Sequence, residues 1–161
     1  MDDRGHSFWV VLLTLFLALA LSVYPLPFWA RWLRPDWAVM VICFWVLFLP
    51  NRVGVGWAWL AGLLMDLLHG SYLGQNAFAL SIVAYFAHVS HQRVRMSGYR
   101  KQAVFIFSMV TVHILLGQWV QNLMGVADIS LLVVLQALTS ALSWPLLHVA
   151  MTYLCYRFVV S

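Results

Sequence analysis

The sequence predicts an all-α integral membrane protein of about six transmembrane helices. Apolar residues make up 64% of the chain and charged residues only 9%, against about 45–50% and about 25% in a typical soluble domain. A soluble domain of this size needs a polar exterior, because most of a small chain lies at its surface. The nine Trp and six Tyr also favour a bilayer, since their amphipathic rings prefer the membrane–water interface. Lipid is therefore the solvent that this composition fits.

Six apolar segments, separated by prolines, glycines or charges, are the predicted helices: 8–24, 37–49, 53–68, 77–89, 103–124 and 129–149. Backbone in lipid must be hydrogen-bonded internally, so each segment should be helical or shielded by protein. A crossing helix needs about 20 residues. The segment 37–49 is shorter, so it is tilted, supplemented by flanking residues, or re-entrant. Pro145 should kink the last helix. Nothing divides the chain, which predicts a single domain over residues 1–161.

The first apolar segment has the length of a secretory signal, and Ala18 and Ala20 have the spacing of a cleavage site. Against cleavage, Asp2 and Asp3 cancel the positive start that a signal requires, and the apolar run continues past the cut. We therefore expect a retained anchor.

The distribution of Lys and Arg predicts the orientation. With six crossings and a cytoplasmic N-terminus, the outer side carries only Arg31 and Arg34, and the inner side carries Arg4, Arg52, Arg93, Arg95, Arg100, Lys101 and Arg157. If the segment 37–49 is re-entrant, the N-terminus lies outside with Arg4. Both alternatives place the loop 90–102 and the C-terminus inside, and the turns 69–76 and 125–128 outside.

The densest positive charge lies in the loop 90–102, at Arg93, Arg95, Arg100 and Lys101. A plain topology determinant is the favoured interpretation. The alternatives are contact with anionic lipid, worth about 1 kcal/mol per basic residue, or with an acidic cytoplasmic partner. Nucleic acid is not an expected partner, because the other basic residues are scattered at the ends of apolar segments rather than clustered on one face.

Asp66 is the one acidic residue inside an apolar segment, and the chain has no Glu. An ionised Asp at the bilayer centre costs about 2.5–3.5 kcal/mol on insertion scales. Because Asp66 lies near the outer end of its segment, a hydrogen-bonding or capping role is favoured over proton or ligand handling. Ala58, Gly62, Asp66 and Gly70 recur every four residues, a stripe that lets helices approach closely. The partner of this stripe is either internal or another protein.

Nothing in the sequence predicts catalysis, a cofactor or a metal. An intramembrane aspartic protease needs two carboxylates that share a proton, and the apolar segments hold one. The histidines and the two cysteines lack the clustering of known metal sites. Beyond Asp66, the candidates for ligand binding are His113, Gln118 and Gln136, and nothing in their spacing indicates that they converge.

Two motifs carry a resemblance to a known family. The first is Arg34-Pro35-Asp36-Trp37, followed by Trp45 and by Pro50-Asn51-Arg52. The second is the stretch 62–77, which reads Gly-Leu-Leu-Met-Asp-Leu-Leu-His-Gly-Ser-Tyr-Leu-Gly-Gln-Asn-Ala. Together these motifs resemble the rod shape-determining protein MreD family of Gram-negative bacteria.

The resemblance implies a non-catalytic subunit of the cell-elongation machinery in the bacterial inner membrane, which supports rod shape and peptidoglycan synthesis without a cofactor. It implies MreC as a direct partner, with MreB, RodA and penicillin-binding protein 2 as further members of the complex. It also implies a fold similar to the substrate-binding subunits of energy-coupling-factor transporters. Architectural roles are implied for Arg34, Pro35, Asp36, Trp37, Pro50, Arg52, Gly62, Asp66, Gly70, Leu73, Gly74 and Gln75.

We therefore expect a membrane scaffold that binds the transmembrane helix of a partner. The alternative is a small-molecule-binding or transport subunit, which a fold-level similarity supports only weakly. A dry, apolar interior would argue against that alternative, because transporter sites gather polar groups near interrupted helices.

Overall fold

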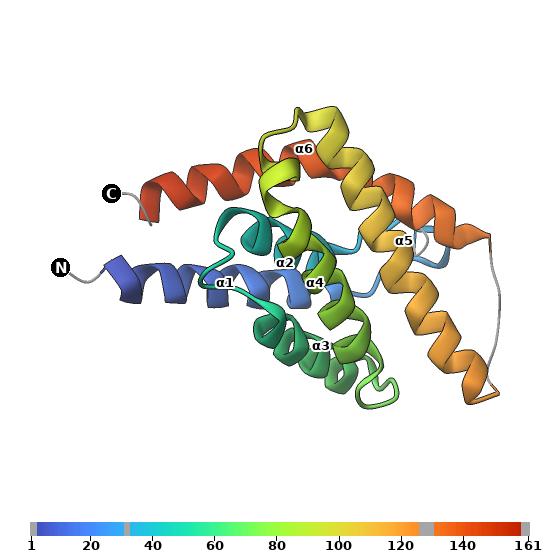
Figure 1. Ribbon diagram of the computed structural model, residues 1–161. Coiled ribbons are helices and arrows are strands. Elements are labelled where there is room, and N and C mark those ends of the chain that lie inside the picture. The colour runs from blue at the N-terminus through green and yellow to red at the C-terminus, as the bar shows by residue number, and fades with distance from the viewer. Residues whose placement is uncertain (1–2, 31–32, 126–130, 159–161) are drawn as a thin grey trace.

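The computed structural model describes residues 3–30, 33–125 and 131–158. Over these ranges the chain is helical, with no strand, and the predicted all-α class is confirmed (Figure 1). The elements are α1 (Asp3–Val23), the short 3-10 helix η1 (Phe28–Ala30), α2 (Trp37–Phe48), α3 (Val55–His69), α4 (Gln75–Arg95), α5 (Tyr99–Leu123) and α6 (Leu132–Phe158).

Helix α2 lies inside the bundle. All ten residues from 38 to 47 are buried, so no side of this helix faces the surroundings. A helix that is apolar all round is stable only when other elements enclose it, and α1, α4, α5 and α6 all pack against α2. The one polar atom of Trp45, its indole N–H, donates to the Thr14 hydroxyl of α1 at 2.9 Å. The buried indole therefore keeps its hydrogen bond.

Two arginines show the path of α2 relative to α1. Before α2, the Arg34 guanidinium donates to the Tyr24 carbonyl at the C-terminal end of α1, at 2.9 Å. After α2, the Arg52 guanidinium contacts the Ser7 hydroxyl near the N-terminal end of α1. The chain thus starts and leaves α2 at opposite ends of α1.

The helices around the basic segment are longer than predicted. α4 continues to Arg95 and α5 starts at Tyr99, so the predicted loop 90–102 is a turn at 96–98 between two helix ends. Hydropathy does not detect the end of α4 and the start of α5 because these helical segments are polar. Their Gln, Arg and Lys residues are nevertheless good helix formers. α6 also runs on to Phe158, through Pro145. Most of the predicted turn 125–128 lies outside the described residues, as does Arg31.

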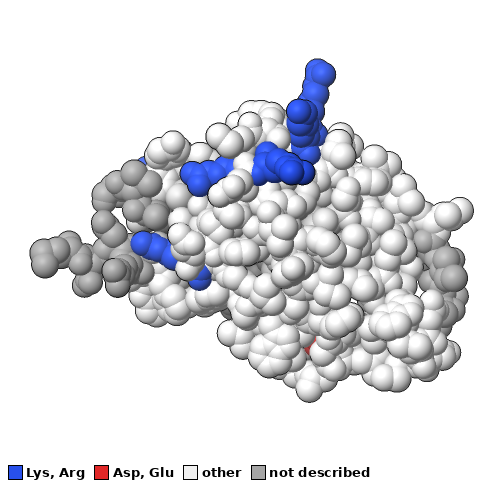
Figure 2. Space-filling model, viewed as in Figure 1, with Lys and Arg blue, Asp and Glu red and all other residues white. Residues whose placement is uncertain are grey.

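The exposed cations gather toward one end of the bundle. Figure 2 shows Lys and Arg side chains over the turn between α4 and α5 and toward the end where α1 starts and α6 finishes. This is the segregation that the loop charges predict. Among the described residues, two helices are long and apolar enough to cross a bilayer, Tyr99–Leu123 and Val133–Phe158.

The stripe of small residues on α3 packs inside the chain. A Cβ atom on Gly62 would lie 2.3 Å from the Ala77 Cα of α4, so the two backbones are in direct contact. Ala58 and Asp66 are also buried, 0% and 1% exposed. The interpretation of this stripe as a contact with another protein is therefore wrong for Gly62, because α4 already occupies that position.

We expect Gly62→Ala to lower the free energy of unfolding by about 1–3 kcal/mol, because the added methyl overpacks a contact between two backbones. Thermal unfolding in detergent measures this. The matched control is Gly56→Ala in the same helix, where an added Cβ meets nothing within 4 Å. The control should be neutral or stabilising by up to about 1 kcal/mol, through helix propensity. Equal stability of the two variants would contradict the close approach.

Candidate functional site: a polar cavity at one end of the bundle

The Asp66 carboxylate closes the hairpin between α3 and α4. Its oxygens accept hydrogen bonds from the Ser71 hydroxyl at 2.9 Å, the Gly74 N–H at 2.8 Å and the Asn76 N–H at 3.0 Å. Amide groups at the start of a helix have no partner within it, so the carboxylate supplies one for α4. All three hydrogen-bond donors lie within the hairpin, and Asp66 itself is only 1% exposed.

Two glycines shape the same turn. Gly70 ends α3 with φ +64°, and Gly74 precedes α4 with φ +96°. Both angles lie in the left-handed region, which side chains with a Cβ rarely adopt. Without the left-handed conformations of these two glycines, the N–H groups of the turn would not point back at Asp66.

Asp36, immediately before α2, forms a buried pair with α5. Its carboxylate lies 2.9 Å from Nδ1 of His113, and both side chains are 8% exposed. The Asp36 backbone N–H donates to the Ser140 hydroxyl of α6 at 2.9 Å. Together with the Arg34 contact to α1, this segment attaches the start of α2 to three surrounding helices.

Gln75, the first residue of α4, attaches that helix to α5. Its side-chain amide donates to the Gly117 carbonyl at 3.2 Å, and the side chain is 7% exposed. Gly117 allows this approach, because a Cβ there would lie 3.3 Å from the Gln75 Nε2.

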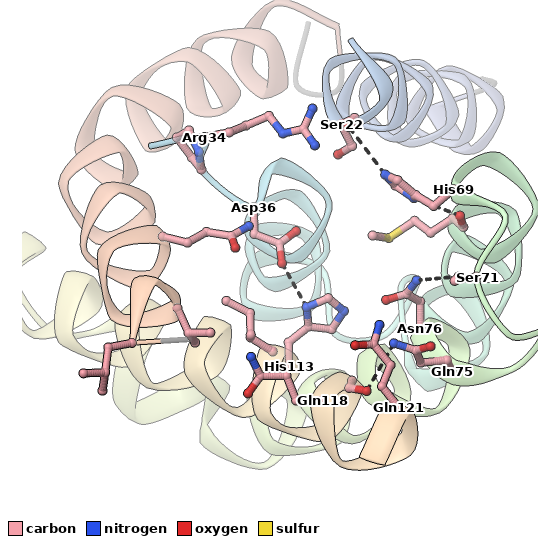
Figure 3. Close-up of a pocket in the computed structure, with 17 residues that line it drawn as sticks. Ser22, Arg34, Asp36, His69, Ser71, Gln75, Asn76, His113, Gln118 and Gln121 are labelled. Atoms are coloured by element: carbon pink, nitrogen blue, oxygen red, sulfur yellow. Dashed lines mark hydrogen bonds and ion pairs between the residues drawn. The ribbon is translucent and has the colours of Figure 1, made fainter. Parts of the chain in front are cut away.

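These groups surround a cavity of about 960 Å³. Figure 3 shows polar side chains from several helices directed into the space between them, with the His113 ring near its middle. The polar lining is Ser22, Arg34, Asp36, His69, Ser71, Gln75, Asn76, His113, Gln118, Gln121 and Gln136. The rest is Pro35, Met65, Ile114, Gly117, Leu131 and Val133. The interior is therefore not wholly apolar at this end.

The cavity lies at the end of the bundle opposite the turn between α4 and α5. Its lining comes from the last turns of α1, α3 and α5 and from the first turns of α2, α4 and α6, or just before them. By the positive-inside rule, this end is the one that the sequence predicts to face outward.

The sequence-predicted residues fall into three places. Arg34, Pro35, Asp36 and Gln75 line the cavity, whereas the stretch 62–74 mainly builds the hairpin beside it and adds Met65, His69 and Ser71 to the lining. Asp66 does not itself line the cavity, although Ser71 and Asn76 do. Leu73 is 72% exposed on the hairpin turn.

The remaining predicted residues lie elsewhere. Trp37 is partly buried against the core at the start of α2. Pro50 and Arg52 lie at the opposite end, in the turn after α2, beside a hollow that Arg95 also lines. Arg93, Arg100 and Lys101 are exposed there, and the Arg95 guanidinium lies 5.7 Å from the centre of the Phe48 ring.

The structure brings together residues that the sequence left apart. His113, Gln118 and Gln136 all line the same cavity. Ser22, His69, Gln121 and Ser140 join them in or beside it, and sequence reasoning did not select them for this site. The available signal is modest: each is a polar side chain in or at the end of an apolar helix.

A bundle of apolar helices that encloses a polar cavity defines a class, the helical membrane protein with an internal polar site. Within the described residues there is no group of three His, Cys, Asp or Glu that could hold a metal. Comparison with known proteins then gives the family.

The family model of the rod shape-determining protein MreD matches residues 4–157. The rod shape-determining protein MreD of Haemophilus influenzae is 33% identical over 146 residues, which cover 90% of each chain. The chain belongs to the MreD family, and its role is in the determination of rod shape. No solved structure matches the chain, so the similarity to subunits of energy-coupling-factor transporters stays a prediction.

We expect Asp66→Ala to lower the free energy of unfolding by about 2–4 kcal/mol, because it leaves two backbone N–H groups of the hairpin without a partner. Ser71→Ala removes only one of the three hydrogen bonds and should cost about 1 kcal/mol. Thermal unfolding in detergent measures both, and amide hydrogen exchange at Gly74 and Asn76 should rise only in the Asp66 variant. Equal costs would mean that the carboxylate does not cap α4.

A double-mutant cycle tests the buried pair. Asp36→Ala and His113→Ala each remove one partner, so their unfolding free energies should be non-additive by about 1–3 kcal/mol. The control cycle pairs Asp36→Ala with Thr111→Ala, because among the described residues the Thr111 hydroxyl bonds only to the Phe107 carbonyl of its own helix. That cycle should be additive within about 0.5 kcal/mol. Additivity in the first cycle would show that the pair contributes nothing to stability.

Proposed function

We propose that this protein is a non-catalytic, multi-pass scaffold of the bacterial inner membrane. In this proposal it binds the transmembrane helix of MreC on its lipid-facing surface and so supports peptidoglycan synthesis during elongation. MreB, RodA and penicillin-binding protein 2 then join through the complex. Membership of the family supports the role in rod shape, and one surface feature, the groove described below, supports the binding of a helix.

Six crossings with a cytoplasmic N-terminus agree best with the geometry. α2 runs from one end of α1 to the other, and helices joined by short turns alternate in direction. The exposed cations at the turn between α4 and α5 then lie in the cytoplasm, as positively charged loops do. The first apolar segment acts as a retained helix of the bundle, since α1 packs against α2.

The observation that carries the proposal is an apolar groove between α1 and α3. Two adjoining hollows of about 570 and 600 Å³ share Phe16, Leu19, Leu64 and Leu67, so they form one groove along both helices. Figure 1 shows the two helices next to each other at the edge of the bundle. The groove is lined by hydrocarbon side chains over most of its length, with Trp57 and Tyr24 toward its two ends.

The shape of this groove suits a helix. Transmembrane helices associate by close van der Waals packing, and small residues let backbones approach. Ala20 and Ala61 lie in the groove between larger side chains, which leaves room for the side chains of a partner. Gly62, another small residue of α3, is not available to a partner helix, because it packs on α4.

We expect Leu64→Trp to reduce the recovery of co-expressed MreC by about tenfold or more, because the larger ring fills the groove, and about 1.4 kcal/mol of binding free energy corresponds to that factor. Affinity purification from mild detergent measures the recovery. Leu142→Trp is the matched control, since Leu142 is a 78% exposed side chain on α6, away from the groove.

The wild-type protein and the control should both retain MreC. Unchanged recovery with Leu64→Trp would remove the groove as the contact. Failure of the well-folded wild-type protein to retain MreC would contradict the proposed partner itself.

A further inference from the structure

The polar cavity contains buried polar side chains whose hydrogen-bonding groups the scaffold role does not explain. We propose that it binds an uncharged small molecule of the size of a sugar, rich in hydroxyl and amide groups, which enters from the end of the bundle opposite the turn between α4 and α5. This inference goes beyond the scaffold role and does not depend on the binding of MreC.

The first argument is hydrogen-bonding capacity left open in the cavity wall. Within the described part of the chain, Nε2 of His113 and Oε1 of Gln75 are buried and have no hydrogen-bond partner. Each side chain is only 7% exposed. A buried polar atom without a partner is costly, so these two atoms need a partner from outside the described residues, which a bound ligand can supply.

The second argument concerns charge. Each charged or titratable side chain of the lining already contacts another group of the protein. Arg34 donates to the Tyr24 carbonyl, the Asp36 carboxylate lies against His113, and the His69 ring bonds to the Met65 carbonyl. A phosphate or a lipid headgroup would need a cation that is free to form charge-assisted hydrogen bonds. Arg34 is the one Lys or Arg among the described lining residues, and the Asp36 carboxylate balances its formal charge, so the lining has no net charge that would favour an ion over an uncharged ligand.

The third argument is the kind of polar group that remains. The side chains of Gln118, Gln121 and Gln136 line the cavity and form no hydrogen bond with any described residue. A carboxamide offers both donors and an acceptor, which match hydroxyl and amide groups on a ligand. None of the described lining residues is Phe, Tyr or Trp, so this part of the wall lacks the large aromatic rings on which a planar heterocycle stacks best.

The size of the cavity agrees with this class. Its volume of about 960 Å³ lies within the range of about 300–1,000 Å³ that small-molecule sites occupy. Recognition would come from several carboxamides on α4, α5 and α6 together with the His113 ring, rather than from one charged anchor.

The test measures thermal unfolding of the full chain in lipid nanodiscs with four related probes. Glucose and N-acetylglucosamine are uncharged, glucosamine carries a cation and glucose 6-phosphate carries an anion. The uncharged sugars should raise Tm by about 3–6 °C at a concentration about ten times their Kd. The charged analogues should bind more weakly, because the formal charges of the described lining, on Arg34 and Asp36, cancel and so reward neither sign.

The double variant Gln118→Leu with Gln136→Leu removes two open carboxamides while it keeps the side-chain volume. It should weaken sugar binding by about tenfold or more, which corresponds to the loss of one or two hydrogen bonds. Gln92→Leu, at the opposite end of the bundle, is the matched control and should bind as the wild type does.

Three results would overturn the proposal. No shift with either uncharged sugar would mean that the cavity holds water only. Stronger binding of glucose 6-phosphate would assign an anion site. A shift with MreC that the double variant abolishes, with no effect of sugars, would assign the cavity to a segment of the partner.

Discussion

The short, enclosed central helix sets the shape of the rest of the molecule. α2 has 12 residues, whereas α1 and α4 have 21, α5 has 25 and α6 has 27. At 1.5 Å per residue, α2 is about 18 Å long and α6 about 40 Å. A central helix shorter than the helices around it cannot fill the bundle over its whole length. The unfilled part is the polar cavity, and the chain just before α2 supplies Arg34, Pro35 and Asp36 to its wall.

The two sequence motifs attach opposite sides of this unfilled space. Arg34 and Asp36 connect the start of α2 to α1, α5 and α6 through hydrogen bonds and the close contact between the Asp36 carboxylate and the His113 ring. On the other side, Asp66 and Gly62 join α3 to α4, and Gln75 then joins α4 to α5. Polar residues in an apolar protein are costly unless they are paired. Here the pairing holds the helix ends apart at a fixed spacing, while apolar side chains pack the opposite half of the bundle.

Hydropathy and loop charge predicted the helical class, the number of helices and the end where cations gather, because these follow from which solvent each residue prefers. The motif around Asp66 also indicated a cap, since the residue lies near a glycine-rich turn. The partner of Gly62 was not predictable, because a small-residue stripe looks the same whichever helix covers it. His113, Gln118 and Gln136 could not be placed together, because their convergence depends on how α5 and α6 cross and not on any spacing along the chain.

The hydrogen bonds that Asp66 accepts from nearby residues have a consequence for the insertion of the chain into the membrane. All three donors to its carboxylate lie within ten residues of it in the chain. The hairpin of α3 and α4 therefore needs no later helix to supply hydrogen-bond donors to the Asp66 side chain. As the nascent chain leaves the insertion machinery, this hairpin can enter lipid as a finished unit. Asp36 differs, because His113 and Ser140 are synthesised long after it, so the start of α2 gains these partners only once α5 and α6 are present.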